Sequence, residues 1–436
     1  MNLFSRPKRT SEVFGISTEI LSDSYVDRGN LDSELQKQMG RTTHIALRGE
    51  SKCGKSWIRQ KNIPEAIAVQ CRLNRTVRDL YSDALSQLGL HLVKQTQSST
   101  SLRGKLEATG EAGFKVIAKV AAKLGGEVEK SDGVMSVPVG NDLDDLRFVS
   151  DIINASGRRL VIEDFHYLSP AERKAFAFDL KALWDLKTYV VVIGIWAENN
   201  LLLHLNPDLS GRIVEMPIYW SAPDLRSVID NGSKALNIEF STAIVARMVE
   251  DSFGTVGILQ RLALATLDEA KIEEGQKHLT TVDQVGSYEG AAMSYAEQLN
   301  ALYQTFAKRV ANGIRQRANS TGIYAHMLSV VLSADDKTLT DGLHTDAIFT
   351  EAHKIETRVQ KPNLRQILLK IDALQVDNDG RGLILSYDEH KDEVFVVDRQ
   401  LFLYRKYATV RWPWEQLIAE ANASASGYDI DEPATI

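Results

Sequence analysis

Apolar residues gather in five short runs, and stretches of helical period separate them. The runs lie at 44–47, 66–72, 159–164, 189–195 and 208–217. The near-continuous hydrophobicity of 189–195 is typical of a strand buried on both faces of a parallel sheet. Between the second and third runs, residues 77–88 carry apolar side chains at i, i+3, i+4, i+7, i+8 and i+11. This spacing predicts an amphipathic helix packed on the sheet.

The first run ends in a glycine-rich loop that precedes a predicted helix over 55–62. The loop matches G-x-x-x-x-G-K-S, in which the glycines let the backbone wrap a phosphate and the first helical N–H groups point at the anion. We expect Lys55 to reach the β- and γ-phosphates of ATP and Ser56 to hold Mg²⁺. The predicted ATP-binding residues here are Gly49, Glu50, Ser51, Lys52, Cys53, Gly54, Lys55 and Ser56.

The third run ends in two acidic residues, Glu163 and Asp164. A strand end of this kind can place one carboxylate on the Mg²⁺ shell and another beside the water that attacks the phosphate. Together with the strand–helix alternation, the two motifs predict the α/β class: a P-loop NTPase three-layer sandwich with a five-stranded parallel sheet.

A third segment precedes the glycine-rich loop. Residues 25–35 hold an aromatic residue, then Arg28-Gly29, then an acid-rich helix. With the two motifs, this segment resembles AAA+ ATPases of the origin-recognition type and the related STAND signalling ATPases. The resemblance covers residues 20–400, most specifically at the nucleotide motifs, and implies an ATP- and Mg²⁺-dependent hydrolase.

The acidic pair departs from the family pattern, which usually has Asp and then Glu. By position, Glu163 takes the role of the magnesium ligand and Asp164 that of the residue beside the attacking water. Because aspartate reaches less far as a base, we expect slow hydrolysis or an exchange of roles between the two acids.

The resemblance also implies residues that sense the nucleotide. Arg212, just before the fifth run, is in the place of an arginine finger that acts on a neighbour's nucleotide, with a surface salt bridge as the alternative. Asn199 or Glu198 is in the place of a γ-phosphate sensor, with loop capping as the alternative. Gly257 stands where relatives carry a lid arginine, and only Arg261, one turn later, could substitute.

The rest of the chain is mainly helical. Helices predicted over 223–236, 242–251 and 257–270 form a lid, and helices over 323–333 and 363–374 followed by two strands resemble a winged-helix module. The predicted domains are an N-terminal segment with a first helix (1–40), an ATPase core (41–220) with an insertion (91–141), a helical lid (221–290), a winged-helix-like domain (291–412) and a C-terminal tail (413–436).

Charge bears on the partners. The chain has a formal net charge of −7, and residues 300–412 hold 16 Lys and Arg against 14 Asp and Glu, a net of +2. Lys354, Arg358, Lys361, Arg365 and Lys370 cluster near the presumed recognition helix. DNA contact is one interpretation of this module, and an autoinhibitory or oligomerisation role is the other.

The number of cysteines and the lengths of the apolar runs indicate the cellular compartment of the protein. The two cysteines, Cys53 and Cys71, give no disulfide framework, and no apolar run approaches 18 residues. We therefore expect a cytoplasmic protein without a membrane partner.

Three functions follow. The first is an ATP-hydrolysing molecular switch of a bacterial defence or stress system, which forms homo-oligomers and controls a separate effector protein. The second is a DNA-binding AAA+ ATPase for replication initiation or transposition targeting. The third is a nucleotide-gated scaffold that binds ATP with little turnover.

Overall fold

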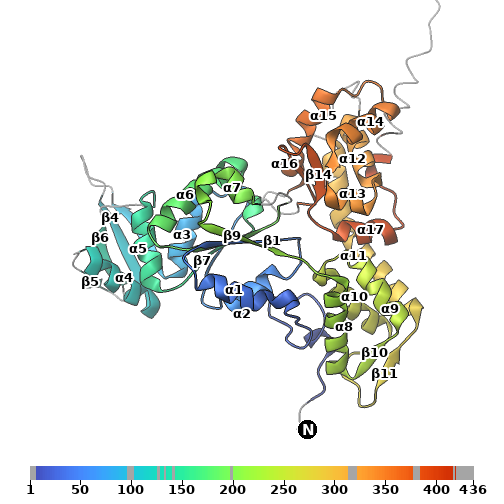
Figure 1. Ribbon diagram of the computed structural model, residues 1–436, viewed down its shortest axis with the longest axis horizontal. Helices are drawn as coiled ribbons and strands as arrows, with labels where there is room; N and C mark the ends of the chain where they lie inside the picture. Colours follow the sequence, from blue (N-terminus) through green and yellow to red (C-terminus); the bar gives the residue numbers. More distant parts are fainter. Residues whose placement is uncertain are drawn as a thin grey trace, which may run out of the picture. The chain divides into compact units, whose positions relative to one another are not determined.

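The computed structural model describes residues 6–95, 103–124, 128–131, 134–139, 143–196, 200–312, 322–376, 383–415 and 418 (Figure 1). The chain divides into two compact units. One unit consists of Met1–Val26, Glu50–Cys53 and Trp220–Ile436, and we call it the helical unit. The other consists of Asp27–Gly49 and Gly54–Tyr219, and we call it the sheet unit. The five-part domain division expected above stays a prediction.

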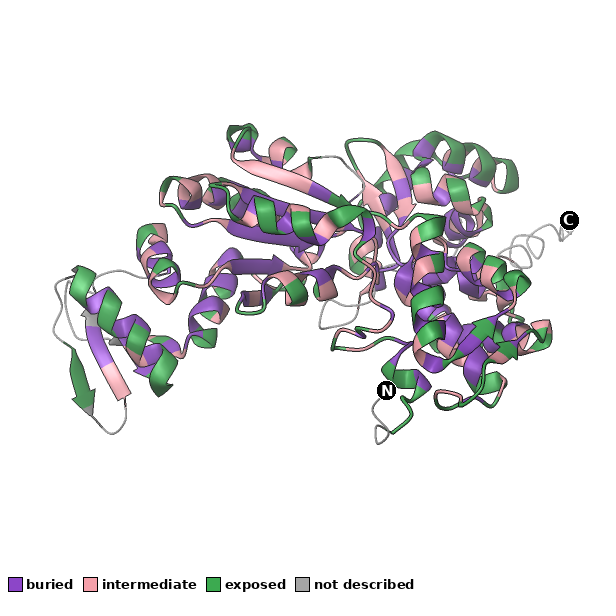
Figure 2. Cartoon of the chain, turned by 60° about the horizontal axis from the view of Figure 1, so that its bottom comes forward, coloured by how far each residue is buried: buried purple, intermediate pink, exposed green. Residues whose placement is uncertain are grey.

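The sheet unit is built on five parallel strands, as the sequence predicts. Their order is β2-β7-β8-β1-β9, so β1 lies between β8 and β9, and β8 separates it from β7. The central strands β1, β7 and β8 are mostly buried (Figure 2), whereas only Met216 and Ile218 are buried in the edge strand β9. The burial of β8 on both faces explains its near-continuous apolar sequence. Their bounds are β1 His44–Gly49, β2 Ile67–Gln70, β7 Leu160–Glu163, β8 Val190–Gly194 and β9 Ile213–Ile218.

Helices cover both faces of this sheet (Figure 1). On one face lie α1 (Leu31–Met39) and α2 (Lys55–Asn62), and on the other lie α3, α5 and α6. The amphipathic face predicted over 77–88 is buried as expected. The remaining helices of the unit are α3 Val77–Gln87, α5 Leu146–Ser156, α6 Pro170–Asp185 and α7 Leu201–Leu205.

The cap of α6 differs from the reciprocal capping box that its sequence indicates. Ser169 Oγ accepts a hydrogen bond from the N–H of Glu172 at 3.3 Å, which is half of the box. The carboxylate of Glu172 instead accepts the N–H of Val77 at 2.7 Å, and so it serves the first turn of α3. The two helices are thereby joined at their starts.

The segment predicted as an insertion over 91–141 is regularly folded. It forms a four-stranded antiparallel sheet in the order β3-β4-β6-β5, against which α4 packs. Leu92 and Leu106 pair across β3 and β4 on the face toward α4. The bounds are β3 Leu90–Gln95, β4 Arg103–Thr109, α4 Gly110–Leu124, β5 Glu129–Ser131 and β6 Val134–Val139.

The helical unit begins with residues from the chain's N-terminus. Val13 and Phe14 are fully buried in a core formed with α8, α9, α10 and α11. A Cβ added at Gly232 would lie 2.2 Å from the Phe14 ring, so the ring packs directly on the backbone of α8. The elements are α8 Ala222–Leu236, β10 Ile238–Phe240, α9 Thr242–Asp251, α10 Val256–Glu269, β11 Thr280–Val282 and α11 Val285–Asn312.

The last part of the helical unit combines helices with a small antiparallel sheet, ordered β12-β14-β13. The structure has two helices where a single helix was predicted over 363–374. The first ends at Leu368 and the second begins at Ile371, and both of these residues are buried. The elements are α12 Ile323–Ser333, α13 Asp336–Asp341, β12 Leu343–His344, α14 Thr345–Ile355, α15 Lys361–Leu368, α16 Ile371–Gln375, β13 Leu385–Asp388, β14 Glu393–Val396 and α17 Gln400–Tyr407.

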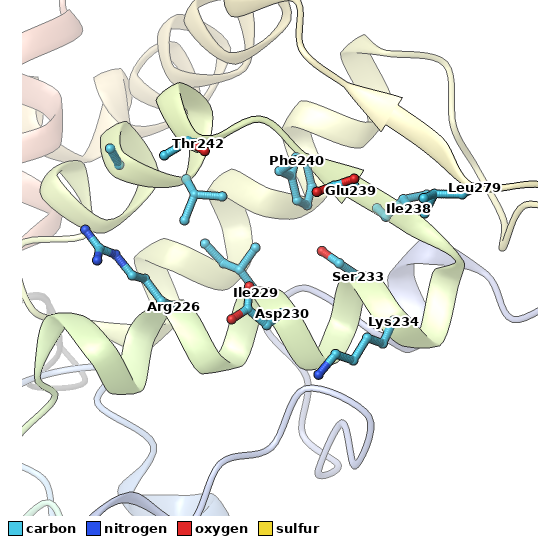
Figure 3. Close-up of a pocket in the computed structure, with 12 residues that line it drawn as sticks. Arg226, Ile229, Asp230, Ser233, Lys234, Ile238, Glu239, Phe240, Thr242 and Leu279 are labelled. Atoms are coloured by element: carbon cyan, nitrogen blue, oxygen red, sulfur yellow. The ribbon is translucent and has the colours of Figure 1, made fainter.

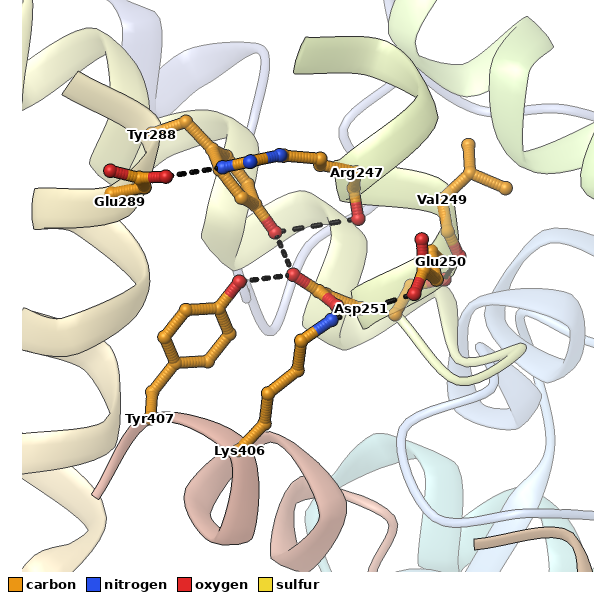
Figure 4. A network of polar contacts seen from close by, with 9 residues as sticks. Arg247, Val249, Glu250, Asp251, Tyr288, Glu289, Lys406 and Tyr407 are labelled. Carbon is orange, nitrogen blue, oxygen red and sulfur yellow. Dashed lines mark hydrogen bonds and ion pairs between the residues drawn. The ribbon is translucent and has the colours of Figure 1, made fainter. Parts of the chain in front are cut away.

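A buried carboxylate joins three helices of this unit (Figure 4). Asp251, at the end of α9, is 1% exposed. It accepts hydrogen bonds from the hydroxyls of Tyr288 in α11 at 2.5 Å and Tyr407 in α17 at 2.6 Å, and from Lys406 Nζ at 2.6 Å. Burial and the hydrogen bond to Asp251 raise the pKa of Tyr407 to about 12, so the phenol stays protonated and donates. No helix within the described ranges has the length and apolarity to cross a bilayer.

Candidate nucleotide-binding site

The glycine-rich loop lies between β1 and α2, as its sequence predicts. β1 ends at Gly49 and α2 begins at Lys55. Gly54 has a φ of 89° and precedes the first turn of α2, where a residue with a Cβ is disfavoured. The N–H groups of that first turn have no carbonyl partner inside the helix, and helix starts of this kind commonly bind anions in proteins.

Lys55 points back into its own loop. Its Nζ donates a hydrogen bond to the carbonyl of Gly49 at 2.9 Å, and the residue is 9% exposed. The neighbouring Ser56 is exposed. The loop therefore holds a cationic group beside an accessible hydroxyl, the two side chains that the sequence assigned to phosphate and Mg²⁺.

The two acids lie at the same edge of the sheet as the loop. Since β1, β8 and β7 are parallel, their carboxyl ends meet at one edge, and Ile162, which precedes Glu163, is in register with Ala46 through Val192 of β8. Adjacent strands are about 4.8 Å apart, so the ends of β1 and β7 are separated by about 10 Å. That span suits a phosphate chain with its metal ion.

Each acid has a partner that the sequence did not identify. Glu163 Oε1 accepts a hydrogen bond from Arg59 Nε in α2 at 3.0 Å, and Asp164 Oδ2 accepts one from Gln70 Nε2 at the end of β2 at 2.8 Å. Both partners come from elements beside the acids, and neither belongs to a motif that a sequence pattern could reveal. The donor set of Ser56 and Glu163 fits Mg²⁺, which prefers oxygen ligands.

His166 is a third side chain near this edge. It is 8% exposed, and its Nδ1 has no hydrogen-bond partner among the described residues. Burial lowers the pKa of His166 well below its usual value, and the charge of Lys55 lowers it further. The ring is therefore neutral at physiological pH.

The tip of the loop, Glu50–Cys53, is assigned to the helical unit and has partners there. The N–H of Gly257 donates to the carbonyl of Lys52 at 3.0 Å, and a Cβ at Gly257 would lie 2.7 Å from the Cβ of Lys52. This close approach explains why a residue without a side chain stands at position 257. Arg261 donates a hydrogen bond to Gln298 at 2.7 Å, and its role as a lid sensor stays a prediction.

Two charged residues after β14 also contact the tip. Arg399 bonds Glu50 Oε1 at 2.8 Å through one guanidinium nitrogen and the carbonyl of Phe253 at 2.8 Å through another. Lys52 Nζ lies 3.5 Å from Asp398 Oδ1. Two opposite charge pairs thus tie the tip to Asp398 and Arg399, although 346 or more residues separate each pair in the sequence.

Arg212 is placed at the opposite edge of the sheet. It precedes β9, and its carbonyl accepts the N–H of His44 at the start of β1. Its guanidinium carbon lies 4.8 Å from the centre of the Trp184 ring, and NH1 donates to the carbonyl of Asp208. Arg212 is therefore remote from the loop of its own subunit. Asn199 and Glu198 lie outside the described residues.

The C-terminal basic cluster is largely neutralised by carboxylates. Lys354 pairs with Glu351, Arg358 with Glu356, Lys361 with Asp346 and Arg365 with Asp392. Lys370 is exposed. Four of the five cations therefore have an acidic neighbour, and the surface is mixed in charge.

Comparisons with known proteins found similar solved structures but no family. A scan of protein-family models and a search of curated proteins gave no match. Among solved structures, the chain is similar to the Orc1 protein of Aeropyrum pernix in complex with DNA (TM-score 0.42, 11% identity, 93% of this chain and 95% of that chain).

Two further structures are similar. One is a STAND protein with a tetratricopeptide repeat sensor from Pyrococcus horikoshii (TM-score 0.35, 12% identity, 96% of this chain and 47% of that chain). The other is the RuvB Holliday junction branch migration motor of Thermotoga maritima (TM-score 0.34, 12% identity, 87% and 93%). TM-scores this low carry no argument about the fold, which is therefore described from the strand order alone. That order and the loop after β1 give the sheet unit the α/β fold of P-loop NTPases, and the chain continues into a helical C-terminal region.

Proposed function

We propose that the protein is an ATP-binding and ATP-hydrolysing molecular switch that controls a separate effector protein. The observation that carries the proposal is the common sheet edge of Lys55, Glu163 and Asp164, with an accessible Ser56 beside them. A cation, a hydroxyl and two carboxylates at one edge are the groups that MgATP hydrolysis needs.

In the proposed complex the chain's residues have distinct roles. Lys55 leaves the carbonyl of Gly49 and contacts the β- and γ-phosphates, while the amides of the loop and of the first turn of α2 surround the phosphate oxygens. Ser56 and Glu163 hold Mg²⁺, which neutralises charge on the phosphates. Asp164 orients the attacking water and accepts its proton.

The position of Arg212 supports a further proposal, assembly into a homo-oligomer. Since this side chain is remote from its own loop, we propose that it acts on the nucleotide of a neighbouring subunit. Asn199 is proposed as the γ-phosphate sensor. An arginine finger contributed in trans makes hydrolysis depend on assembly.

The contacts of the loop's tip support a regulatory role. Glu50 and Lys52 pair with Arg399 and Asp398, so a phosphate that reorganises the tip changes the surroundings of β14 and α17. We propose that this part, as a winged-helix-like domain, transmits nucleotide state to an effector of a bacterial defence or stress system. The neutralised basic cluster favours this role over DNA binding, which needs unpaired cations for the phosphate backbone.

The proposal is tested by mass and turnover measurements. ATP should change the size-exclusion mass of the parent protein, and Lys55→Ala should abolish that change. ATP affinity should fall by about tenfold or more, because a charge-assisted contact contributes ~1.5–3 kcal/mol. Lys61→Ala, in the same helix, is the matched control and should retain both properties. Identical profiles for parent and Lys55→Ala, with and without ATP, would contradict the switch.

Hydrolysis is tested separately. Asp164→Asn should bind ATP with nearly parental affinity and lose multiple turnover. A parent protein that binds ATP without turnover would instead support the scaffold function. ATP-stimulated DNA binding that weakens steeply with salt would support the replication or transposition function.

A further inference from the structure

A groove in the helical unit lies away from the residues discussed so far (Figure 3). It has a volume of about 570 Å³ and runs between helix α8 and strand β10. Its apolar lining includes Ile229, Ile238, Phe240 and Val245. The volume is within the range of about 300–1,000 Å³ that ligand pockets occupy.

The strand beside the groove has one unpaired edge. β10 pairs in parallel with β11, and the N–H of Thr280 bonds the carbonyl of Asn237 while the N–H of Ser241 bonds that of Val282. In a parallel ladder, alternate residues direct both backbone groups to the same side. Since 237, 239 and 241 face β11, the N–H and C=O of Ile238 and Phe240 face away from it.

These four backbone groups have no partner among the described residues. Ile238 and Phe240 are 4% and 6% exposed, and a backbone group this far from water normally has a hydrogen-bond partner. An open strand edge of this kind is a template for one more strand. The groove thus presents both an apolar lining and a row of unused donors and acceptors.

A buried hydroxyl gives an independent sign of a ligand. Ser233, on the groove face of α8, is 8% exposed, and its Oγ has no hydrogen-bond partner within the described part of the chain. Figure 3 shows this oxygen directed into the groove. An unpartnered buried hydroxyl costs about 1–3 kcal/mol, which an occupant that hydrogen-bonds it would recover.

The charged side chains along the rim of the groove indicate which charges a bound peptide must carry. Arg226, Asp230 and Lys234 follow one another at one-turn spacing on α8, and Glu239 lies on β10. All four side chains are exposed, and none has an ion pair within the ranges that the structure covers. From Arg226 to Lys234 the helix rises about 12 Å. Four residues of an extended peptide cover about 13 Å. The first, third and fifth side chains of a bound strand can therefore lie opposite Arg226, Asp230 and Lys234.

We propose that the groove binds an extended segment of a partner protein, which adds a strand to the free edge of β10. The segment has the pattern acidic, apolar, basic, apolar, acidic. The basic residue faces Asp230 and Glu239, the acidic residues face Arg226 and Lys234, and the apolar residues cover Ile229 and Val245. This proposal is independent of nucleotide binding, because it uses none of the residues assigned to ATP.

The test uses synthetic peptides and the full chain. The first peptide is fluorescein-labelled Ser-Glu-Val-Lys-Val-Glu-Ser, and the second reverses its charges as Ser-Lys-Val-Glu-Val-Lys-Ser. A third replaces both valines by proline, which removes backbone donors and disfavours a strand. In fluorescence anisotropy titrations, the first should bind about tenfold more tightly than either of the others, since each cross-strand charge pair contributes ~0.2–1 kcal/mol.

Two variants locate the binding. Glu239→Lys should weaken the first peptide at least about threefold and favour a peptide with glutamate at its centre. Glu297→Lys makes the same charge change at an exposed position of α11 outside the groove and should change nothing.

Hydrogen exchange gives a second readout that does not depend on a variant. The first peptide should slow amide exchange in residues 236–241, because it engages the N–H groups of Ile238 and Phe240. Equal binding of all three peptides, or binding without this protection, would overturn the proposal.

Discussion

Asp164 leaves the end of β7 with a φ of 57°, a left-handed conformation that few residues other than glycine adopt. This turn, rather than a straight strand end, brings its carboxylate to Gln70. The acidic pair could be predicted from sequence because it follows a recognisable apolar run. Its partners Arg59 and Gln70 could not, since their contacts depend on the neighbouring strand β2 and helix α2, far away in the sequence.

His44 provides a prediction at the residue scale. Its Nδ1 accepts the N–H of Val190 at 2.9 Å, so Nε2 carries the proton and donates to the carbonyl of Leu180 at 2.8 Å. Burial lowers the pKa of His44 from 6.5 to about 4. The neutral ring therefore stabilises the fold fully above pH 6.5, and this contribution is lost as the pH falls toward 4 and the unfolded chain takes up the proton.

Thermal unfolding at several pH values checks this. We expect the unfolding temperature of the sheet unit to fall as the pH is lowered from 6.5 to 5. His44→Gln should lower the unfolding temperature at pH 7 and make it depend less on pH. His278→Gln changes an exposed histidine and should keep the parental slope. A His44→Gln curve parallel to that of the parent would assign the pH dependence to other groups.

At the scale of elements, we expect the hydrogen bonds of Asp251 with Tyr288, Lys406 and Tyr407 to hold α9, α11 and α17 together. Asp251→Asn removes the charge that Lys406 faces and places an amide donor against two phenol donors. We expect a loss of about 1–3 kcal/mol in the stability of the helical unit, measured by urea unfolding. Glu250→Gln is the control: Glu250 lies 3.5 Å from the same ammonium but is exposed, so its loss should be under about 1 kcal/mol. Equal losses would mean that the buried bonds contribute little.

Periodicity predicts an element well when one face is buried. Residues 242–251 and 323–333 form helices with the predicted bounds, because each has a continuous apolar face. β3 and β4 were missed because their inward residues, such as Leu92 and Leu106, are too few to establish a period. Their pairing also depends on β6, about 30 residues later in the chain. The break at 369–370 was missed because helix-forming residues continue through it.

At the scale of the molecule, the tip of the loop contacts Asp398 and Arg399, and we expect these contacts to affect nucleotide binding. If the pair between Glu50 and Arg399 restrains the tip, Arg399→Gln should increase ATP affinity by about fivefold, as expected for a pair contributing ~1 kcal/mol. Glu50→Gln should have a similar effect, and the double variant should gain little more. Calorimetric titration with ATP measures the affinities of the parent, the two single variants and the double variant. Weaker binding by Arg399→Gln would show that the guanidinium attracts the nucleotide instead.

The burial of Val13 and Phe14 has a consequence for synthesis on the ribosome. All of Asp27–Tyr219 emerges before the partners of these two side chains, which lie beyond residue 220. The sheet unit can therefore fold during translation, while Val13 and Phe14 wait with their apolar side chains uncovered. Shortened chains that stop before α10 would leave that N-terminal segment exposed, and chaperones that recognise apolar segments are expected to hold it.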